Sequence, residues 1–305
     1  MLGILVNLMF KMLFPVIFAY ILYNMGILTE THKKNMTDVL LNCAVPFTIV
    51  MSSQQELNTE TSRTLLIATV FCIAFYAVLT PVLKALVKKM GMENWKGRVF
   101  VCSILFYNCT LVGFPVLNEI YGKLGLLCAV ISSMVYNAFF YTWAVRYLGA
   151  SGKGGWKAIF LNKYALCTIA ALLLYSLQIT VPEPLNSTFN MLSAMTLPLA
   201  MLIAGCNMAA SGVKKIVRDR SLYLPAFMRN LIVPAICFAI LRLLGVKSDV
   251  AGMCTLIAAL PTGTMTSIMA SESGHEGRYA TNIMVFSTLL MAITIPLWTV
   301  IVKTF

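Results

Sequence analysis

Two short segments of an otherwise apolar sequence place a proline beside a glycine and several small polar side chains. They are residues 107–118 and 258–268. Proline lacks a backbone hydrogen-bond donor, and its ring clashes with the carbonyl four residues earlier, so we expect each segment to interrupt a helix. The substrate-binding candidates that we single out are Asn108, Thr110, Gly113 and Pro115 in the first segment and Pro261, Thr262, Gly263 and Thr264 in the second.

An interrupted helix exposes the first backbone N–H groups of its second half. These groups carry partial positive charge and suit an anion. In hydrocarbon such a break survives only inside protein or beside a watery cavity. The alternative is a proline kink that neighbouring helices seal, with the hydroxyls bonded to their own backbone. Because the chain contains two such segments rather than one, we favour a binding site.

Arg229 is the charged residue that lies deepest in an apolar stretch, between Pro225 and Pro234. An arginine at the centre of a membrane helix costs about 2.5–3.5 kcal/mol on insertion scales and usually serves a purpose. It could be a counter-charge for a substrate carboxylate, or it could hold a neighbouring helix by its carbonyl groups. A third possibility is that it extends to the lipid headgroups. We include Arg229 among the candidate substrate-binding residues.

The apolar stretches lack the residues that catalysis, metal binding or nucleotide binding would need. No Asp or Glu lies in the core of a stretch, and the nine cysteines form no CxxC pair. The sequence contains no Walker motif and no nucleophile–base pair within a stretch. We therefore expect no metal ion, no cofactor and no enzymatic activity.

The composition indicates a membrane protein. Hydrophobic residues make up 59% of the 305 residues and charged residues 11%, whereas soluble domains carry about 25% charged residues. A helix needs about 20 apolar residues to cross a bilayer. We find ten such stretches, at residues 12–29, 39–55, 64–83, 99–118, 124–145, 164–182, 186–213, 221–241, 250–271 and 279–302. The expected fold is an all-α membrane protein with about ten transmembrane helices, of which the fourth and ninth are broken.

The Lys and Arg residues predict the orientation in the membrane. Sixteen of them lie in the loops after odd-numbered stretches and five on the opposite side. Basic loops remain in the cytoplasm, so both termini are expected outside and the protein in the cell membrane. The net charge of +12 then reflects topology and contact with anionic lipid. A nucleic-acid partner is not expected.

The spacing of the stretches predicts an internal duplication. A basic, glycine-rich connection at residues 149–157 separates five stretches from five. Because five is odd, the second half enters the membrane from the opposite face, as in an inverted repeat. Residues 1–148 would form the first repeat and residues 158–305 the second.

Three short motifs resemble those of a known family. They are NCAVP at residues 42–46, NCTLVGFP at residues 108–115 and ALPTG at residues 259–263. Their order, the chain length and the helix count resemble the auxin efflux carrier family. That family includes the plant PIN-FORMED auxin carriers and bacterial permeases assigned to malate or malonate.

The resemblance implies a homodimer in which each subunit has a support domain and a transport domain that moves like an elevator. Helices four and nine would cross at Pro115 and Pro261 beside the substrate, and Asn108 would contact it. The sequence departs from the family where Thr262 and Thr264 stand in place of an asparagine after the second proline. We expect a secondary transporter of a small organic anion, such as a carboxylate or an auxin-like acid. The alternative is a membrane ligand sensor or regulatory subunit that transports nothing.

Overall fold

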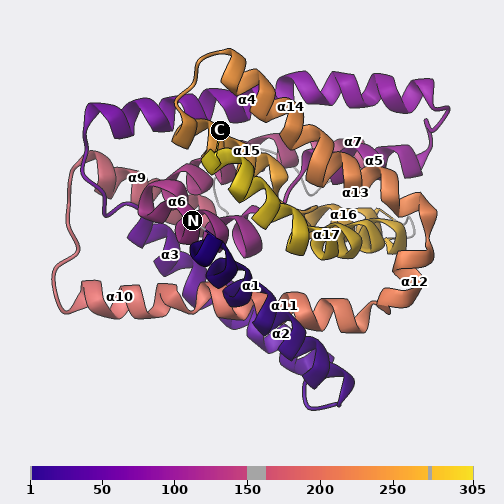
Figure 1. Cartoon of the computed structure of the whole chain (residues 1–305), viewed down its shortest axis with the longest axis horizontal. Coiled ribbons are helices and arrows are strands. Elements are labelled where there is room, and N and C mark those ends of the chain that lie inside the picture. Colours follow the sequence, from indigo (N-terminus) through magenta and orange to yellow (C-terminus); the bar gives the residue numbers. More distant parts are fainter. Residues whose placement is uncertain (1, 150–162, 274–276, 305) are drawn as a thin grey trace.

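The structure is almost entirely helical. The computed structural model describes residues 2–149, 163–273 and 277–304, and Figure 1 shows them as a bundle of helices. Within these ranges the β-pairing is limited to one antiparallel bridge, between Tyr107 and Thr262. The predicted all-α class is therefore confirmed for the described residues. The predicted linker, residues 149–157, lies outside them except for Gly149.

The helices of the first half differ widely in length. They are α1 (Leu2–Asn24), α2 (Glu30–Val39), α3 (Val45–Ser52), α4 (Thr59–Lys89), α5 (Trp95–Leu105), α6 (Phe114–Phe139) and α7 (Val145–Tyr147). Those of the second half are α9 (Lys163–Ser176), α10 (Leu185–Ala194), α11 (Thr196–Ala210), α12 (Val213–Arg218), α13 (Tyr223–Phe227), α14 (Val233–Leu243), α15 (Ser248–Ala259), α16 (Thr264–Glu272) and α17 (Arg278–Thr304).

Five helical stretches of the described chain are long and apolar enough to cross a membrane. They are Thr59–Lys89, Cys109–Tyr147, Leu185–Ala210, Arg220–Leu243 and Arg278–Thr304. Three shorter apolar helices are Phe10–Asn24, Tyr164–Ser176 and Ser248–Ala259. This supports a multi-pass membrane protein. The number of ten spans and the inverted repeat stay predictions.

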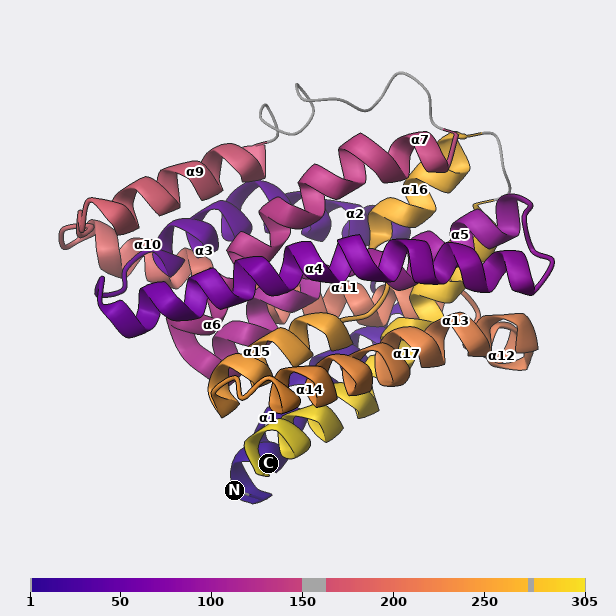
Figure 2. The same ribbon diagram turned by 90° about the horizontal axis from the view of Figure 1, so that it is seen from above.

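The outer surface of helix α4 is suited to a lipid bilayer rather than to water. It exposes a series of large apolar side chains along its length, namely Leu66, Val70, Ile73, Val78 and Val82. In water such a surface would be costly, whereas lipid chains solvate it. Figure 2 shows α4 running along the whole length of the molecule.

Most helices run back and forth along the long axis of the molecule, whereas α1 and α2 lie obliquely to it (Figure 1). In Figure 1 the connections from α3 to α4 and from α9 to α10 lie at the left, and those from α4 to α5 and from α11 to α12 lie at the right. We call the two ends the left end and the right end. The basic residues of the α4–α5 connection are thus at the right end, which the charge pattern predicts to be cytoplasmic.

Three prolines follow short π-helical turns instead of breaking a helix. The turns are η1 (Leu40–Ala44), η2 (Cys109–Gly113) and η5 (Met228–Ile232), and the second residue after each is Pro46, Pro115 or Pro234. A π-turn bonds residue i to i+5, which gives the proline ring room and removes the need for its missing N–H. These helices therefore continue past their prolines.

The position of the first interruption differs from the prediction. We expected it at Pro115, but the helix stops at Phe106–Asn108 and has resumed when it reaches that proline. Within α6, the predicted boundary between spans at residues 118–124 contains a kink at Gly122, where the backbone leaves the helical region. That residue has φ of 62°, which glycine adopts without strain.

The helices pack into two groups, and each group draws on both halves of the chain. The support group consists of α1, α2, α3, α9, α10 and α11. The crossover group consists of α4, α5, α6, α13, α14, α15, α16 and α17. The groups meet where α11 lies against η2 and α17 and where α3 lies against α6. The candidate site is at this meeting surface.

Candidate functional site at the helix crossing

Two interrupted helices cross at residues 106–108 and 260–263. The backbone N–H of Asn108 donates to the carbonyl of Pro261 at 2.8 Å, and that of Gly263 donates to the carbonyl of Phe106 at 2.9 Å. Extended backbone inside a helical protein leaves its polar groups without helical partners. Here each strand supplies partners for the other, so the two breaks depend on each other.

Gly263 allows the two strands to approach closely. A Cβ atom at this position would lie 2.9 Å from the carbonyl oxygen of Tyr107 and 3.3 Å from that of Phe106. Both contacts are to backbone, which cannot move without opening the crossing. The predicted importance of Gly263 therefore has a steric explanation.

Gly263→Ala is expected to destabilise the protein by about 1–3 kcal/mol, the usual cost of forcing a methyl group into a packed site. Thermal unfolding in detergent measures the loss. Ile268→Ala is a matched control, since Ile268 lies on the same helix α16 and is 44% exposed. Equal melting temperatures for Gly263→Ala and the wild type would show that the crossing is looser than described.

Arg229 joins the ends of both first half-helices. Its side chain is fully buried. Nη1 donates to the carbonyl of Ile104, in the last turn of α5, at 2.8 Å. Nε donates to the carbonyl of Leu260, which ends α15, at 2.8 Å, and Nη2 reaches that of Ile257 at 3.4 Å. The guanidinium also lies over the Tyr107 ring, 5.0 Å from its centroid.

This arrangement gives Arg229 an electrostatic role. The last carbonyl groups of a helix have no partners within it and carry partial negative charge. Arg229 neutralises this charge for α5 and α15 together. The sequence left several roles open for Arg229. The geometry fits the one in which its side chain holds neighbouring helices by their carbonyl groups.

The adjacent residue, Asn230, connects the second break to helix α17. It is fully buried, and its Oδ1 accepts a hydrogen bond from the Ser287 hydroxyl at 2.6 Å. The same hydroxyl oxygen accepts the backbone N–H of Thr262 at 3.1 Å. The indole N–H of Trp298 donates to the carbonyl of Asn230 at 2.9 Å. Helix α17 is thereby tied to both η5 and the second break.

The second half-helices begin on the opposite side of the crossing from Arg229. Asn108 caps η2, where its Oδ1 accepts the N–H of Leu111 at 3.3 Å. Gly263 precedes α16 and provides no side-chain cap. In the described part of the chain, no hydrogen bond uses the backbone N–H of Thr110, Thr264 or Met265. Free donors of two helix starts thus lie near one another.

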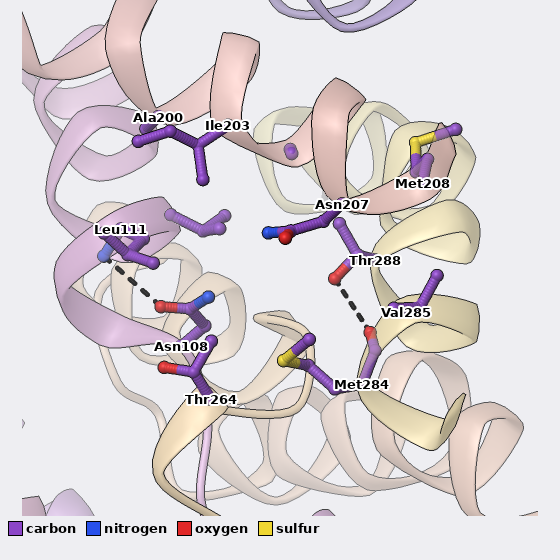
Figure 3. Close-up of a pocket in the computed structure, with 12 residues that line it drawn as sticks. Asn108, Leu111, Ala200, Ile203, Asn207, Met208, Thr264, Met284, Val285 and Thr288 are labelled. Carbon is purple, nitrogen blue, oxygen red and sulfur yellow. Dashed lines mark hydrogen bonds between the residues drawn. The ribbon is translucent and has the colours of Figure 1, made fainter. Parts of the chain in front are cut away.

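A small cavity lies at these helix starts, between the crossover and support groups (Figure 3). Its volume is about 30 Å³, enough for water but far below the roughly 300 Å³ of ordinary ligand pockets. It is lined by Asn108, Leu111, Val112, Ala200, Ile203, Ala204, Asn207, Met208, Thr264, Met284, Val285 and Thr288. None of these side chains is charged, and most are apolar.

Asn108 and Thr264 are the two predicted residues that line this cavity, one from each of the two crossing segments. Thr262 faces away, since it is fully buried and its hydroxyl donates to the carbonyl of Ser103 at 2.9 Å. Pro261 and Gly263 form the crossing itself.

The other predicted residues lie outside the cavity lining. Thr110 sits on η2, and Gly113 packs near Leu260. Pro115 lines a different cavity, and Arg229 is sealed behind the crossing.

Asn207 is a lining residue that the sequence reasoning missed. Figure 3 shows its amide pointing from α11 into the cavity, across from Asn108. Its side chain makes no hydrogen bond within the described residues. The available signal was its polarity, because Asn207 is an amide within the apolar helix Thr196–Ala210. Thr288 was missed as well, and its hydroxyl bonds the Met284 carbonyl of its own helix at 2.8 Å.

The sequence matches a known protein family over most of its length. The family described as membrane transport protein matches residues 4–158 and 153–299, nearly the whole chain. The chain is therefore a membrane transport protein. It belongs to the auxin efflux carrier family, as the three motifs indicated.

Two named relatives align with nearly the whole chain. An uncharacterized transporter of Methanothermobacter thermautotrophicus is 21% identical over 291 residues, which cover 94% of each chain. The uncharacterized transporter YfdV of Escherichia coli K12 is 24% identical over 288 residues, or 88% of each chain. Neither name states a substrate.

Proposed function

We propose that this protein is a secondary transporter of small organic anions and that the anion binds at the helix crossing. The observation that carries the proposal is that the crossing separates the partly negative carbonyl ends of two helices from the partly positive amino-terminal ends of two others. The carbonyl ends of α5 and α15 face Arg229, and the amino-terminal ends of η2 and α16 face the cavity. A carboxylate placed there would accept free backbone N–H groups and the amides of Asn108 and Asn207.

The cavity lining also limits the substrate. Because no charged side chain lines it, the anion must be held by neutral donors and helix ends. Removing a carboxylate from water is costly unless it is well hydrogen-bonded. We therefore expect a solute with one delocalised negative charge and an apolar body to be held better than a multiply charged one.

The small volume argues for movement during transport. About 30 Å³ cannot hold an organic acid, so the crossover group must separate from α11 for the substrate to enter. A shift of the crossover group along the support group would carry the site toward either face, which is an elevator-type mechanism. A homodimer joined through the support group, with both termini outside the cell membrane, completes the proposal.

Flux into liposomes tests this function. Purified protein would be reconstituted and supplied with labelled malate, malonate or indole-3-acetate, with and without sodium or a proton gradient. We expect saturable uptake of at least one acid, which excess unlabelled acid reduces. Protein-free liposomes are the control.

A sensor or regulatory subunit would behave differently in the same experiment. It would bind an acid, seen as a rise in melting temperature with ligand concentration, and would move none of it. Saturable binding without flux under every gradient would replace the transporter with this alternative.

A further inference from the structure

A second, larger cavity lies one helical turn from the site. We call it the vestibule, and its volume is about 370 Å³. Leu111 and Val112 line the small cavity, and Pro115, Asn118 and Glu119 of the same helical stretch line the vestibule.

Helix α11 shows the same progression on the facing side. Ala200 lines the small cavity, and Thr196 and Leu197 line the vestibule. Residues three or four apart lie on one face of a helix. The two cavities are therefore consecutive spaces between the same two helices.

A cationic side chain, that of Lys11, lines the vestibule, whereas no charged side chain lines the small cavity. Nζ of Lys11, on α1, lies 2.6 Å from Oε1 of Glu119, on α6, and the two side chains are 50% and 30% exposed. This ion pair links the support group to the crossover group. Facing it, the hydroxyls of Thr48 and Thr196 are 2.6 Å apart and that of Ser193 donates to Thr48 at 3.1 Å.

We propose that the vestibule is the access path from the left end of the molecule to the helix crossing, and that Lys11 attracts the transported anion into it. Glu119 competes with the anion for Lys11. An arriving carboxylate would replace Glu119 as the partner of the Lys11 ammonium group. The loss of the ion pair would release α6 from α1 when the crossover group must move. The inference rests on the proposed function for the identity of the ligand.

Charge-selective labelling tests the vestibule without any substrate. Ala194 is exposed and lines the cavity, so Ala194→Cys can be modified by a sulfonate-bearing or a trimethylammonium-bearing methanethiosulfonate, with the wild-type chain as background. Lys11→Gln should lower the ratio of anionic to cationic labelling rates roughly tenfold at low salt, and Glu119→Gln should raise it. High salt should reduce both effects. An unchanged ratio would remove Lys11 from the role of attracting anions.

Flux measurements test whether the path leads to the site. With the acid that the wild type transports, Lys11→Gln should raise KM by about threefold or more at low salt and Glu119→Gln should lower it, as expected for electrostatic capture. Modification of Ala194→Cys with either reagent should block uptake. Normal uptake after complete modification would show that solutes reach the crossing by another way.

The chain offers matched controls at the same end. Lys247 and Glu60 form another exposed ion pair, at 2.7 Å, beside a separate cavity that Thr59 also lines. Lys247→Gln should leave KM unchanged, and modified Thr59→Cys should transport normally. If these variants behave like the Lys11 and Ala194 variants, the vestibule has no special role. If the wild type moves no acid at all, the proposed function fails, and the labelling ratios still report on the vestibule.

Discussion

Arg229→Lys is expected to keep the buried positive charge and still lose most of the transport activity. The planar guanidinium reaches Ile104 and Leu260 with two different nitrogen atoms, each at 2.8 Å. Lysine has one nitrogen and cannot reproduce this fork. A buried carbonyl left without a donor costs about 1–3 kcal/mol, so we expect a lower melting temperature and a strongly reduced initial rate of uptake.

Arg229→Met removes both the charge and the hydrogen bonds, so comparison with Arg229→Lys shows what the charge alone contributes. Methionine leaves the carbonyl groups of Ile104 and Leu260 both without a donor, and each costs about 1–3 kcal/mol, so the melting temperature should fall further than in Arg229→Lys. Arg242→Met is the control, because Arg242 ends the same helical stretch and is exposed. If Arg229→Met melts like the wild type, the carbonyl ends of α5 and α15 do not need this residue.

Asn108→Ala is expected to reduce uptake at least about tenfold. Asn108 caps η2, and removal of such a cap costs about 0.5–2 kcal/mol. The change also removes the amide that faces the cavity, and each lost hydrogen bond to a bound charged group is worth about 1.5–3 kcal/mol. The initial rate of uptake at several substrate concentrations measures the combined effect.

Asn108→Ser distinguishes the two contributions. Serine caps helices nearly as well as asparagine but is too short to donate to a ligand from the same position, so stability should return while KM stays high. Asn190→Ala is the control, since Asn190 lies on α10 and bonds within its own helix. Full transport by Asn108→Ala would exclude Asn108 from the binding site.

The match between sequence and structure is uneven, and particular residues show why. The second interruption lies where Pro261 predicted it, because no π-turn precedes that proline and its break is filled by a partner strand. The first interruption lies at Phe106–Asn108 and ends seven residues before Pro115. A π-turn is a local rearrangement with no reliable sequence signal, so the effect of Pro115 on its helix could not be read in advance.

The sequence predicted only those site residues that depend on local features of the chain. Asn108 and Thr264 follow directly from the breaks, which are local features. Asn207 comes from α11, and its position opposite Asn108 depends on how the support and crossover groups pack. The assignment of Arg229 also needed coordinates, since one stretch of sequence cannot show which carbonyl groups a side chain reaches.

The sequence by itself determined the environment, the helical class and the presence of two weak points in the backbone. These are consequences of composition and of proline and glycine chemistry, which act within a few residues. The tertiary structure alone decided that the weak points meet, that Arg229 closes one side of the crossing and that the other side opens on a cavity. Those outcomes depend on contacts between segments far apart in the sequence, such as Arg229 with Ile104 and Asn108 with Pro261, which no local pattern specifies.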